Sequence, residues 1–187
     1  MKFVVAITGA SGSLYAQRLL NVLSNSSHEI HVVLSTHARE VAQAETNGLE
    51  LPSSCQVHGD ASMQVPFVSG SAKFDAMVVI PCSMGMLGRI AHGYSDSTIA
   101  RAADVFLKEK RRLILVPRET PWNLIQARNV VTLLEAGAQI IPAIPSFYHR
   151  PETVLDVIDT VVARILDHLG LDHAQTKRWM EPETLKE

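Results

Sequence analysis

Residues 2–12 read KFVVAITGASG, and this stretch decides the fold class of the chain. The β-branched run from Lys2 to Thr8 stops at a glycine, which predicts a buried strand. Ser13 to Leu23 then places its leucines near helical spacing. A strand that enters a glycine turn and continues into a helix is the repeating unit of a parallel α/β sheet.

The same alternation continues along the chain and predicts one α/β domain over residues 1–187. Further strands are expected at 29–35, 75–80, 112–116 and 139–141, and helices at 36–47, 85–91, 98–110, 122–136 and 151–169. Asp96 or Ser97 offers an N-cap for the helix at 98. Residues 49–73 lack a clear period and are expected to form an irregular loop, and residues 170–187 form a polar tail. This order predicts a doubly wound parallel sheet with helices on both faces.

Composition excludes several functional classes. The formal net charge is −2 with no basic block, which disfavours a nucleic-acid partner. Cys55 and Cys82 are too few for a disulfide framework, and Cys82 reads as a small buried hydrophobe. No window is long and apolar enough to span a bilayer, and no signal peptide precedes the first strand, so we expect a soluble, cytoplasmic protein. Histidines and cysteines lack metal-site spacing, so no metal is expected.

Polar or small residues follow every predicted strand. They are Gly9 to Gly12, Ser35-Thr36, Pro81-Cys82-Ser83, Pro117-Arg118-Glu119, and the run from Pro142 to Arg150. In an open parallel sheet, ligands bind beyond the carboxyl ends of the strands. Five such ends together predict a binding edge.

The turn from Gly9 to Gly12 opens a helix, where backbone N–H groups favour a phosphate or another anion. The alternative is a tight turn without a ligand. The turn lacks the full G-x-G-x-x-G spacing, and Ser35 replaces the acidic residue that would hold an NAD ribose. A mononucleotide is therefore favoured. Ser35, Thr36 and Arg39 are compatible with an NADP site, but the chain has no Tyr-x-x-x-Lys pair.

Charged residues carry two interpretations each. Arg118 and Glu119 form either a surface ion pair or a ligand-facing pair at a strand end. Arg101, Asp104 and Lys108 lie three and four residues apart, which suits a solvated charge ladder as well as a phosphate site. Arg164 sits among apolar residues and is compatible with a snorkelling side chain.

Six segments together resemble the flavin prenyltransferase (UbiX-type) family. They are TGASG at 8–12, AETN around Glu45, PCSMGMLGRIAHGYSD at 81–96, IARAADVFLKE at 99–109, LILVPRETP at 113–121 and PAIPSFYHRPETV at 142–154. The resemblance covers nearly the whole chain in the expected order.

The resemblance implies a Rossmann-like homo-oligomer, a dodecamer in known members, with sites formed where subunits meet. It implies that FMN is bound by Gly9, Ala10, Ser11, Ser35, Ser83, Met84, Gly85, Met86 and Arg118. It further implies that dimethylallyl phosphate is held by Arg101, Lys108, Tyr148 and Arg164, and that Ser11, Glu45, Glu119, Arg101 and Lys108 take part in catalysis. By the same resemblance, Phe67 to Ser71 contacts the prenyl chain and Trp179 covers it.

The implied reaction joins a dimethylallyl group to N5 and C6 of reduced FMN, without a metal, and yields prenylated FMN for a partner decarboxylase. The alternatives are a flavin-dependent cysteine decarboxylase of similar fold and a non-catalytic carrier of FMN.

Overall fold

The computed structural model describes residues 1–176 and contains one six-stranded sheet. The strands are β1 (Lys2–Ile7), β2 (Glu29–Leu34), β3 (Cys55–Gly59), β4 (Ala76–Cys82), β5 (Arg112–Pro117) and β6 (Gln139–Ile140). All neighbours pair in parallel, in the order β3-β2-β1-β4-β5-β6. This confirms the predicted doubly wound sheet, and its strand order is that of the Rossmann fold.

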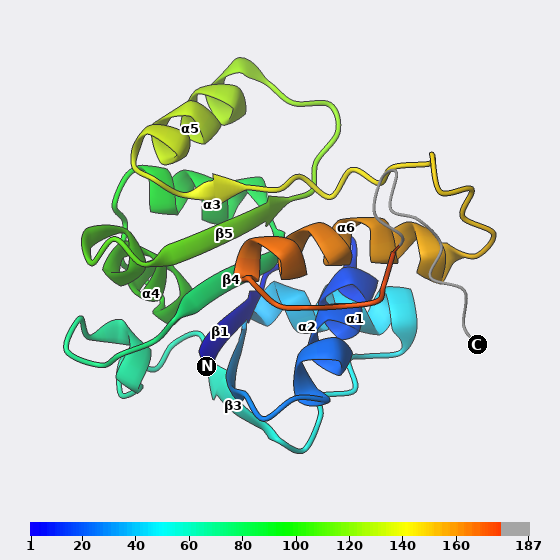
Figure 1. The fold of residues 1–187 in the computed structure, drawn as a ribbon. Helices are drawn as coiled ribbons and strands as arrows, with labels where there is room; N and C mark the ends of the chain where they lie inside the picture. Colours follow the sequence, from blue (N-terminus) through cyan, green and yellow to red (C-terminus); the bar gives the residue numbers. More distant parts are fainter. Residues whose placement is uncertain (177–187) are drawn as a thin grey trace.

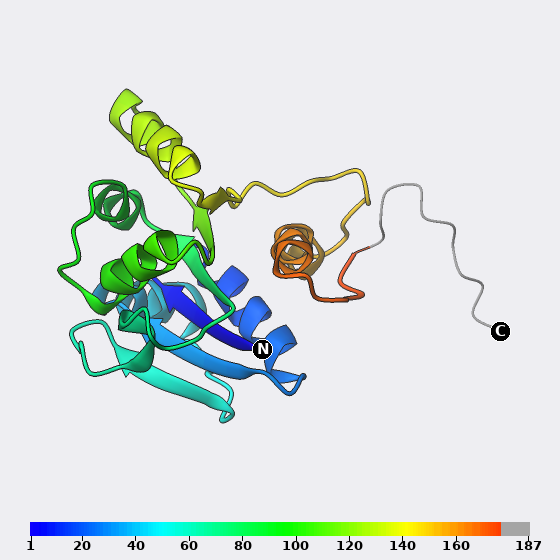
Figure 2. The same ribbon diagram turned by 60° about the vertical axis from the view of Figure 1, so that its left-hand side comes forward.

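Helices cover both faces of the sheet. They are α1 (Ser13–Ser24), α2 (Thr36–Thr46), α3 (Met84–Ala91), α4 (Thr98–Lys108), α5 (Leu124–Glu135) and α6 (Val154–Leu169), with a short 3-10 turn η1 (Pro66–Val68). Helices α1 and α6 pack on one face, and α3 and α4 pack on the other (Figure 1). Figure 2 shows α6 well separated from α3, α4 and α5. Within residues 1–176, no helix combines the length and apolar character needed to cross a bilayer.

Side-chain caps fix where the helices begin. The Ser97 hydroxyl caps α4, as predicted, by accepting a hydrogen bond from the N–H of Ala100 at 3.3 Å. Helix α6 begins at Val154 rather than at the predicted Pro151, because the Thr153 hydroxyl caps it and accepts from the N–H of Asp156 at 3.1 Å. Ser35 and Ser83 cap α2 and α3 in the same way.

The interval 49–73 is not irregular throughout, which corrects the prediction from sequence. Cys55–Gly59 forms β3, the edge strand beside β2, and Pro66–Val68 forms η1. Strand β3 has no apolar alternation, and Val57, its one β-branched residue, is 46% exposed.

The rings of His31 and His58 stack on each other and contact Phe67 of η1. His31 is buried on β2, and its Nδ1 lies 2.9 Å from His58 Nε2 on β3, with the rings nearly parallel. The Phe67 ring packs edge-on against both histidine rings, and the Phe74 ring packs edge-on against His31. Burial and the nearby His31 lower the pKa of His58. The cluster therefore favours a neutral His58.

We expect this pair to make the fold less stable in mild acid. Because the His58 pKa is lowered in the folded state, the unfolded chain binds the proton first as the pH falls below 6.5, its ordinary value. Thermal unfolding should therefore show a falling melting temperature between pH 7 and pH 5, with a shallower slope in His58→Gln. The exposed His92 provides a control, and an unchanged slope in His58→Gln would refute this explanation.

Candidate functional site

A cavity of about 400 Å³ opens at the carboxyl ends of the strands. It is lined by Thr8, Gly9, Ser35, Thr36, His37, Asp60, Ser83, Gly85, Met86 and Arg89. The residues come from the ends of β1, β2, β3 and β4 and from the first turns of α2 and α3, except Arg89, which lies in the last turn of α3. The cavity thus lies at the edge where the sequence predicts a ligand.

Two glycines in the turn after β1 are required by the geometry. A Cβ atom on Gly9 would overlap His37, so only glycine allows the turn and α2 to approach this closely. Gly12 has φ 113°, a left-handed conformation that side chains rarely adopt. The turn therefore brings bare backbone to the rim of the cavity.

The carboxylate of Glu45, from α2, lies on the first turn of α1. It accepts hydrogen bonds from the N–H of Gly12 at 3.0 Å, from the N–H of Ser13 at 2.9 Å and from the Ser13 hydroxyl at 2.5 Å. Burial raises the pKa of Glu45, but hydrogen bonds from Ser11, Ser13 and Gly12 outweigh it and leave the pKa lowered. The sequence predicts an external anion at this helix start, and the structure places the protein's own carboxylate there.

Ser11 lies between the Glu45 carboxylate and the Arg118 guanidinium. Its hydroxyl interacts with the Glu45 carboxylate, and its carbonyl oxygen accepts a hydrogen bond from Arg118 Nε at 3.1 Å. Arg118 follows β5, so three distant segments meet at this exposed serine. Within residues 1–176 Arg118 forms no ion pair with Glu119, which excludes that alternative. The arrangement suits a proton relay that opens toward solvent or a ligand.

Two helix N-termini border the cavity. Ser35 and Ser83, the N-caps of α2 and α3, both line it, and each helix start carries a partial positive charge. Arg89, which pairs with Asp96 at 3.6 Å, adds a positive side chain. Burial raises the pKa of Asp60 despite its hydrogen bond from the N–H of Ile99 at 2.8 Å. The cavity therefore suits a phosphate better than a cation.

The structure brings most predicted flavin contacts to one edge. Gly9, Ser35, Ser83, Gly85 and Met86 line the cavity, while Ala10, Ser11 and Arg118 lie on adjoining turns. Met84 and Met86 have buried side chains, so they offer backbone groups. Sequence reasoning named Thr36 at this edge but missed Thr8, His37, Asp60 and Arg89. Of these, Thr8 and His37 directly adjoin predicted positions.

The four predicted phosphate-binding groups are not brought together within one chain. Arg101 pairs with Asp104 at 2.8 Å and Lys108 with Glu109 on α4, which covers one face of the sheet. Arg164 pairs with Asp167 at 2.8 Å on α6, which covers the other face. The exposed Tyr148 ring lies beside His149 in the loop before α6.

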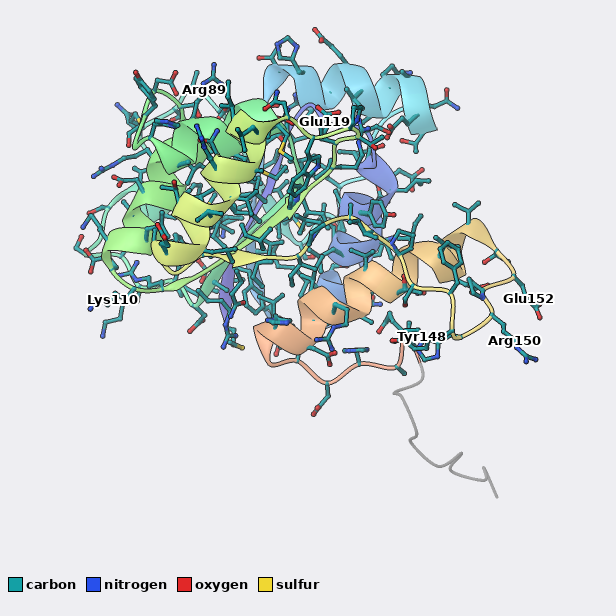
Figure 3. All side chains as sticks on the ribbon, turned by 90° about the horizontal axis from the view of Figure 1, so that it is seen from above. Arg89, Lys110, Glu119, Tyr148, Arg150 and Glu152 are labelled. Carbon is teal, nitrogen blue, oxygen red and sulfur yellow. The ribbon has the colours of Figure 1, made fainter. Side chains whose placement is uncertain are left out.

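Figure 3 shows two of the predicted residues, Glu119 and Tyr148, at separate places. Glu119 and Arg89 lie toward the carboxyl edge of the sheet, while Tyr148 lies apart from them with Arg150 and Glu152. Trp179 lies outside the described residues. Among residues 1–176, no three His, Cys, Asp or Glu side chains are grouped to hold a metal ion.

Comparison with known proteins decides among the alternatives. The flavoprotein family model matches residues 1–167. The chain is 44% identical over 182 residues to a flavin prenyltransferase UbiX of Methanocaldococcus jannaschii, covering 96% of this chain and 98% of that protein. A probable UbiX-like flavin prenyltransferase of Streptomyces sp. (strain D7) is 45% identical, with 96% and 92% covered. The chain belongs to the flavin prenyltransferase family.

Solved structures agree with this assignment. The FMN-dependent, dodecameric UbiX-like decarboxylase of Escherichia coli O157:H7 superposes with a TM-score of 0.93 at 40% identity, covering 97% of this chain and 100% of that one. AnUbiX (PadA1), solved with FMN and dimethylallyl pyrophosphate, gives 0.92 at 41% identity, with 97% and 98% covered. The cysteine decarboxylase TvaF, at 20% identity and 0.62, shares the fold alone. This flavin prenyltransferase is therefore an enzyme that uses FMN.

The residues present fit FMN. Gly9 and Gly85 line the cavity without a side chain, and the starts of α2 and α3 offer N–H groups for a phosphate. Ser35 and Ser83 have small side chains and Gly85 has none, which leaves the cavity open.

Proposed function

We propose that this flavin prenyltransferase joins the dimethylallyl group of dimethylallyl phosphate to N5 and C6 of reduced FMN. The product, prenylated FMN, would serve a partner decarboxylase. The observation that carries the proposal is the cluster of Ser11, Glu45 and Arg118 beside the cavity at the strand ends. The Ser11 hydroxyl, the Glu45 carboxylate and the Arg118 guanidinium beside this cavity support the proposal, because they suit proton transfer next to a mononucleotide.

The cavity supports an assignment of groups to FMN. The N–H groups at the starts of α2 and α3, with the Ser35 and Ser83 hydroxyls, would hold the phosphate. Gly9, Ala10 and Ser11, the backbone from Ser83 to Met86, and Arg118 would hold the rest. In this assignment Glu45 keeps the glycine turn in place rather than touching the phosphate.

Reduced FMN, when bound, supplies two nucleophilic atoms, N5 and C6. The allylic C–O bond breaks, and the leaving phosphate takes the electron pair of that bond. Arg101, Lys108, Arg164 and Tyr148 would stabilise the negative charge that develops on it. Ser11 would accept the N5 proton and pass its own hydroxyl proton to Glu45. The lowered pKa of Glu45 keeps the carboxylate in the ionised form, which can accept that proton. In ring closure Glu119 would give a proton to the alkene of the attached prenyl chain, C6 would bond to the resulting tertiary carbocation, and the C6 proton would return to Glu119.

The four cationic and phenolic groups would meet only between copies of the chain. Arg101 and Lys108 lie on α4 and Arg164 on α6, on opposite faces of the sheet. Large apolar side chains are exposed on α5 and on the loop before α6, among them Leu124, Ile125, Ile144 and Phe147. Exposed apolar surface of this extent marks interfaces. We propose a homo-oligomer, a dodecamer like the similar E. coli protein, with each site shared between copies.

A product mass tests the proposed function directly. The protein is incubated without oxygen with reduced FMN and dimethylallyl phosphate, and the flavin is released and weighed by mass spectrometry. We expect a flavin heavier by one five-carbon unit. Unmodified FMN with either the monophosphate or the diphosphate donor would indicate a carrier instead. A cysteine-terminated peptide that loses carbon dioxide would indicate a decarboxylase.

Glu119 can be tested separately from binding. Glu119 is exposed beyond β5, and one carboxylate oxygen accepts from the N–H of Thr120 at 3.0 Å. Glu119→Gln keeps this acceptor but removes the titrating group, so ring closure should slow about a hundredfold while FMN affinity stays unchanged. Single-turnover rates of the cyclised product measure the effect. An unchanged rate would remove Glu119 from the reaction.

A further inference from the structure

The buried hydroxyl of Thr8 joins the two turns that border the flavin cavity. One is the glycine turn after β1, and the other is the Ser83 turn after β4. We infer that Thr8 is a positioning residue, whose hydroxyl fixes the Ser83 turn against β1 and thereby sets the affinity of the cavity for FMN. The inference rests on the proposed assignment of this cavity to FMN.

The Thr8 side chain continues the hydrogen bonding between β1 and β4 beyond the last paired residues of the two strands. Strands β1 and β4 pair from Phe3 and Ala76 to Ala6 and Val79. Beyond that register the N–H of Thr8 donates to the Pro81 carbonyl oxygen at 3.2 Å, and the Thr8 hydroxyl donates to the same oxygen at 2.8 Å. The hydroxyl then accepts from the N–H of Ser83 at 2.8 Å. A side chain thus continues the contact between the strands up to the cavity.

The Thr8 hydroxyl has no proton left for a ligand. Its one hydrogen goes to Pro81, and Thr8 as a whole is 2% exposed. Although the residue lines the cavity, its hydroxyl therefore acts through Ser83 rather than on FMN.

Ser83 passes this constraint on to α3. Its hydroxyl accepts from the N–H of Met86 at 3.3 Å, and its carbonyl oxygen accepts from the N–H of Leu87 at 2.9 Å. The direction in which the first turn of α3 presents its N–H groups thus depends on where Ser83 is held. Thr8→Val has nearly the same shape but can neither donate nor accept, and it leaves the Ser83 N–H without its acceptor.

Fluorescence titration of FMN against Thr8→Val and Thr8→Ser tests the inference. We expect the valine variant to bind FMN about ten- to hundredfold more weakly, with an altered flavin absorption spectrum. The serine variant keeps the hydroxyl and should bind within about threefold of the parent protein. Recovery by serine separates the hydroxyl from the methyl group that packs beside it.

Thr160, on α6, provides a matched control away from the cavity. Its hydroxyl accepts from the N–H of Ser146 at 3.2 Å and donates to the Val157 carbonyl oxygen at 2.7 Å, and the residue is 7% exposed. Thr160→Val therefore removes the same two kinds of bond away from the cavity. We expect it to lower the melting temperature as Thr8→Val does, but to leave FMN affinity unchanged.

Three results would overturn the inference. The first is parent-like FMN affinity and spectrum in Thr8→Val, and the second is an equal loss of FMN affinity in Thr8→Val and Thr160→Val. The third needs no variant: if the Ser83 amide exchanges with solvent as fast as an exposed loop amide, Thr8 does not hold it. Failure of the parent protein itself to bind FMN would instead contradict the proposed function.

Discussion

Replacing Glu45 with alanine is expected to slow prenyl transfer about a thousandfold, near the upper end of what loss of one preorganised group costs. The carboxylate receives hydrogen bonds from Ser11, Gly12 and Ser13, so its loss removes the proposed proton acceptor and releases the glycine turn. The lost helix cap should also lower the free energy of unfolding by about 1–2 kcal/mol. Single-turnover product formation and chemical denaturation measure the two effects.

Two further variants separate these roles of Glu45. Glu45→Gln retains an acceptor for the turn but no charge, so it should recover most of the stability and little of the rate. Glu50→Gln, an exposed carboxylate outside the cavity, should change neither. Because the Glu45 pKa is lowered in the folded state, its contribution to stability should disappear as the pH falls below its ordinary value of 4.5. A full rate in Glu45→Gln would exclude the carboxylate as the proton acceptor.

Mixed oligomers of Arg101→Ala and Arg164→Ala chains are expected to be more active than either variant alone. Each variant by itself should lose about a hundredfold in rate, because one group that stabilises the leaving phosphate is missing. If α4 comes from one copy and α6 from another, a random equal mixture leaves about a quarter of the sites with both arginines intact. Co-expression of two differently tagged chains, followed by double purification, provides the mixture.

A matched pair on one helix provides the control. Arg101 and Lys108 both lie on α4, so mixing Arg101→Ala with Lys108→Ala never restores an α4 that carries both groups. This mixture should stay as slow as its components. Equal activity of the two mixtures, in oligomers that contain both tagged chains, would show that the arginines do not act in one shared site.

The sequence predicts those parts of the fold that have strong local signals. The KFVVAIT run and the helix cap at Ser97 define their elements through apolar pattern and side-chain chemistry. Strand β3 could not be found, because its only specification is pairing with β2, which is formed between distant segments. The start of α6 shifted by three residues because Thr153, and not Pro151, makes the capping bond.

Strand ends alone determine where several of the predicted binding residues lie. Gly9, Ser35 and Ser83 follow buried strands, and the parallel order of the sheet brings them together. The bonds of Glu45 to the glycine turn and of Arg118 to Ser11 depend on how α2 and β5 are placed in three dimensions. No spacing in the chain encodes them. Local sequence also cannot tell that Arg101 and Arg164 lie on opposite faces, since each forms an ordinary ion pair three residues along its own helix.

The most direct test is a structure of the assembled protein with FMN and a dimethylallyl phosphate analogue. We predict that FMN lies against Gly9, Ser35 and Ser83, with Ser11 and Arg118 beside its ring. We further predict that Arg101 and Lys108 of one copy meet Tyr148 and Arg164 contributed by another copy around the prenyl phosphate. An assembly with FMN elsewhere, or with these four side chains far apart across every subunit contact, would contradict the account.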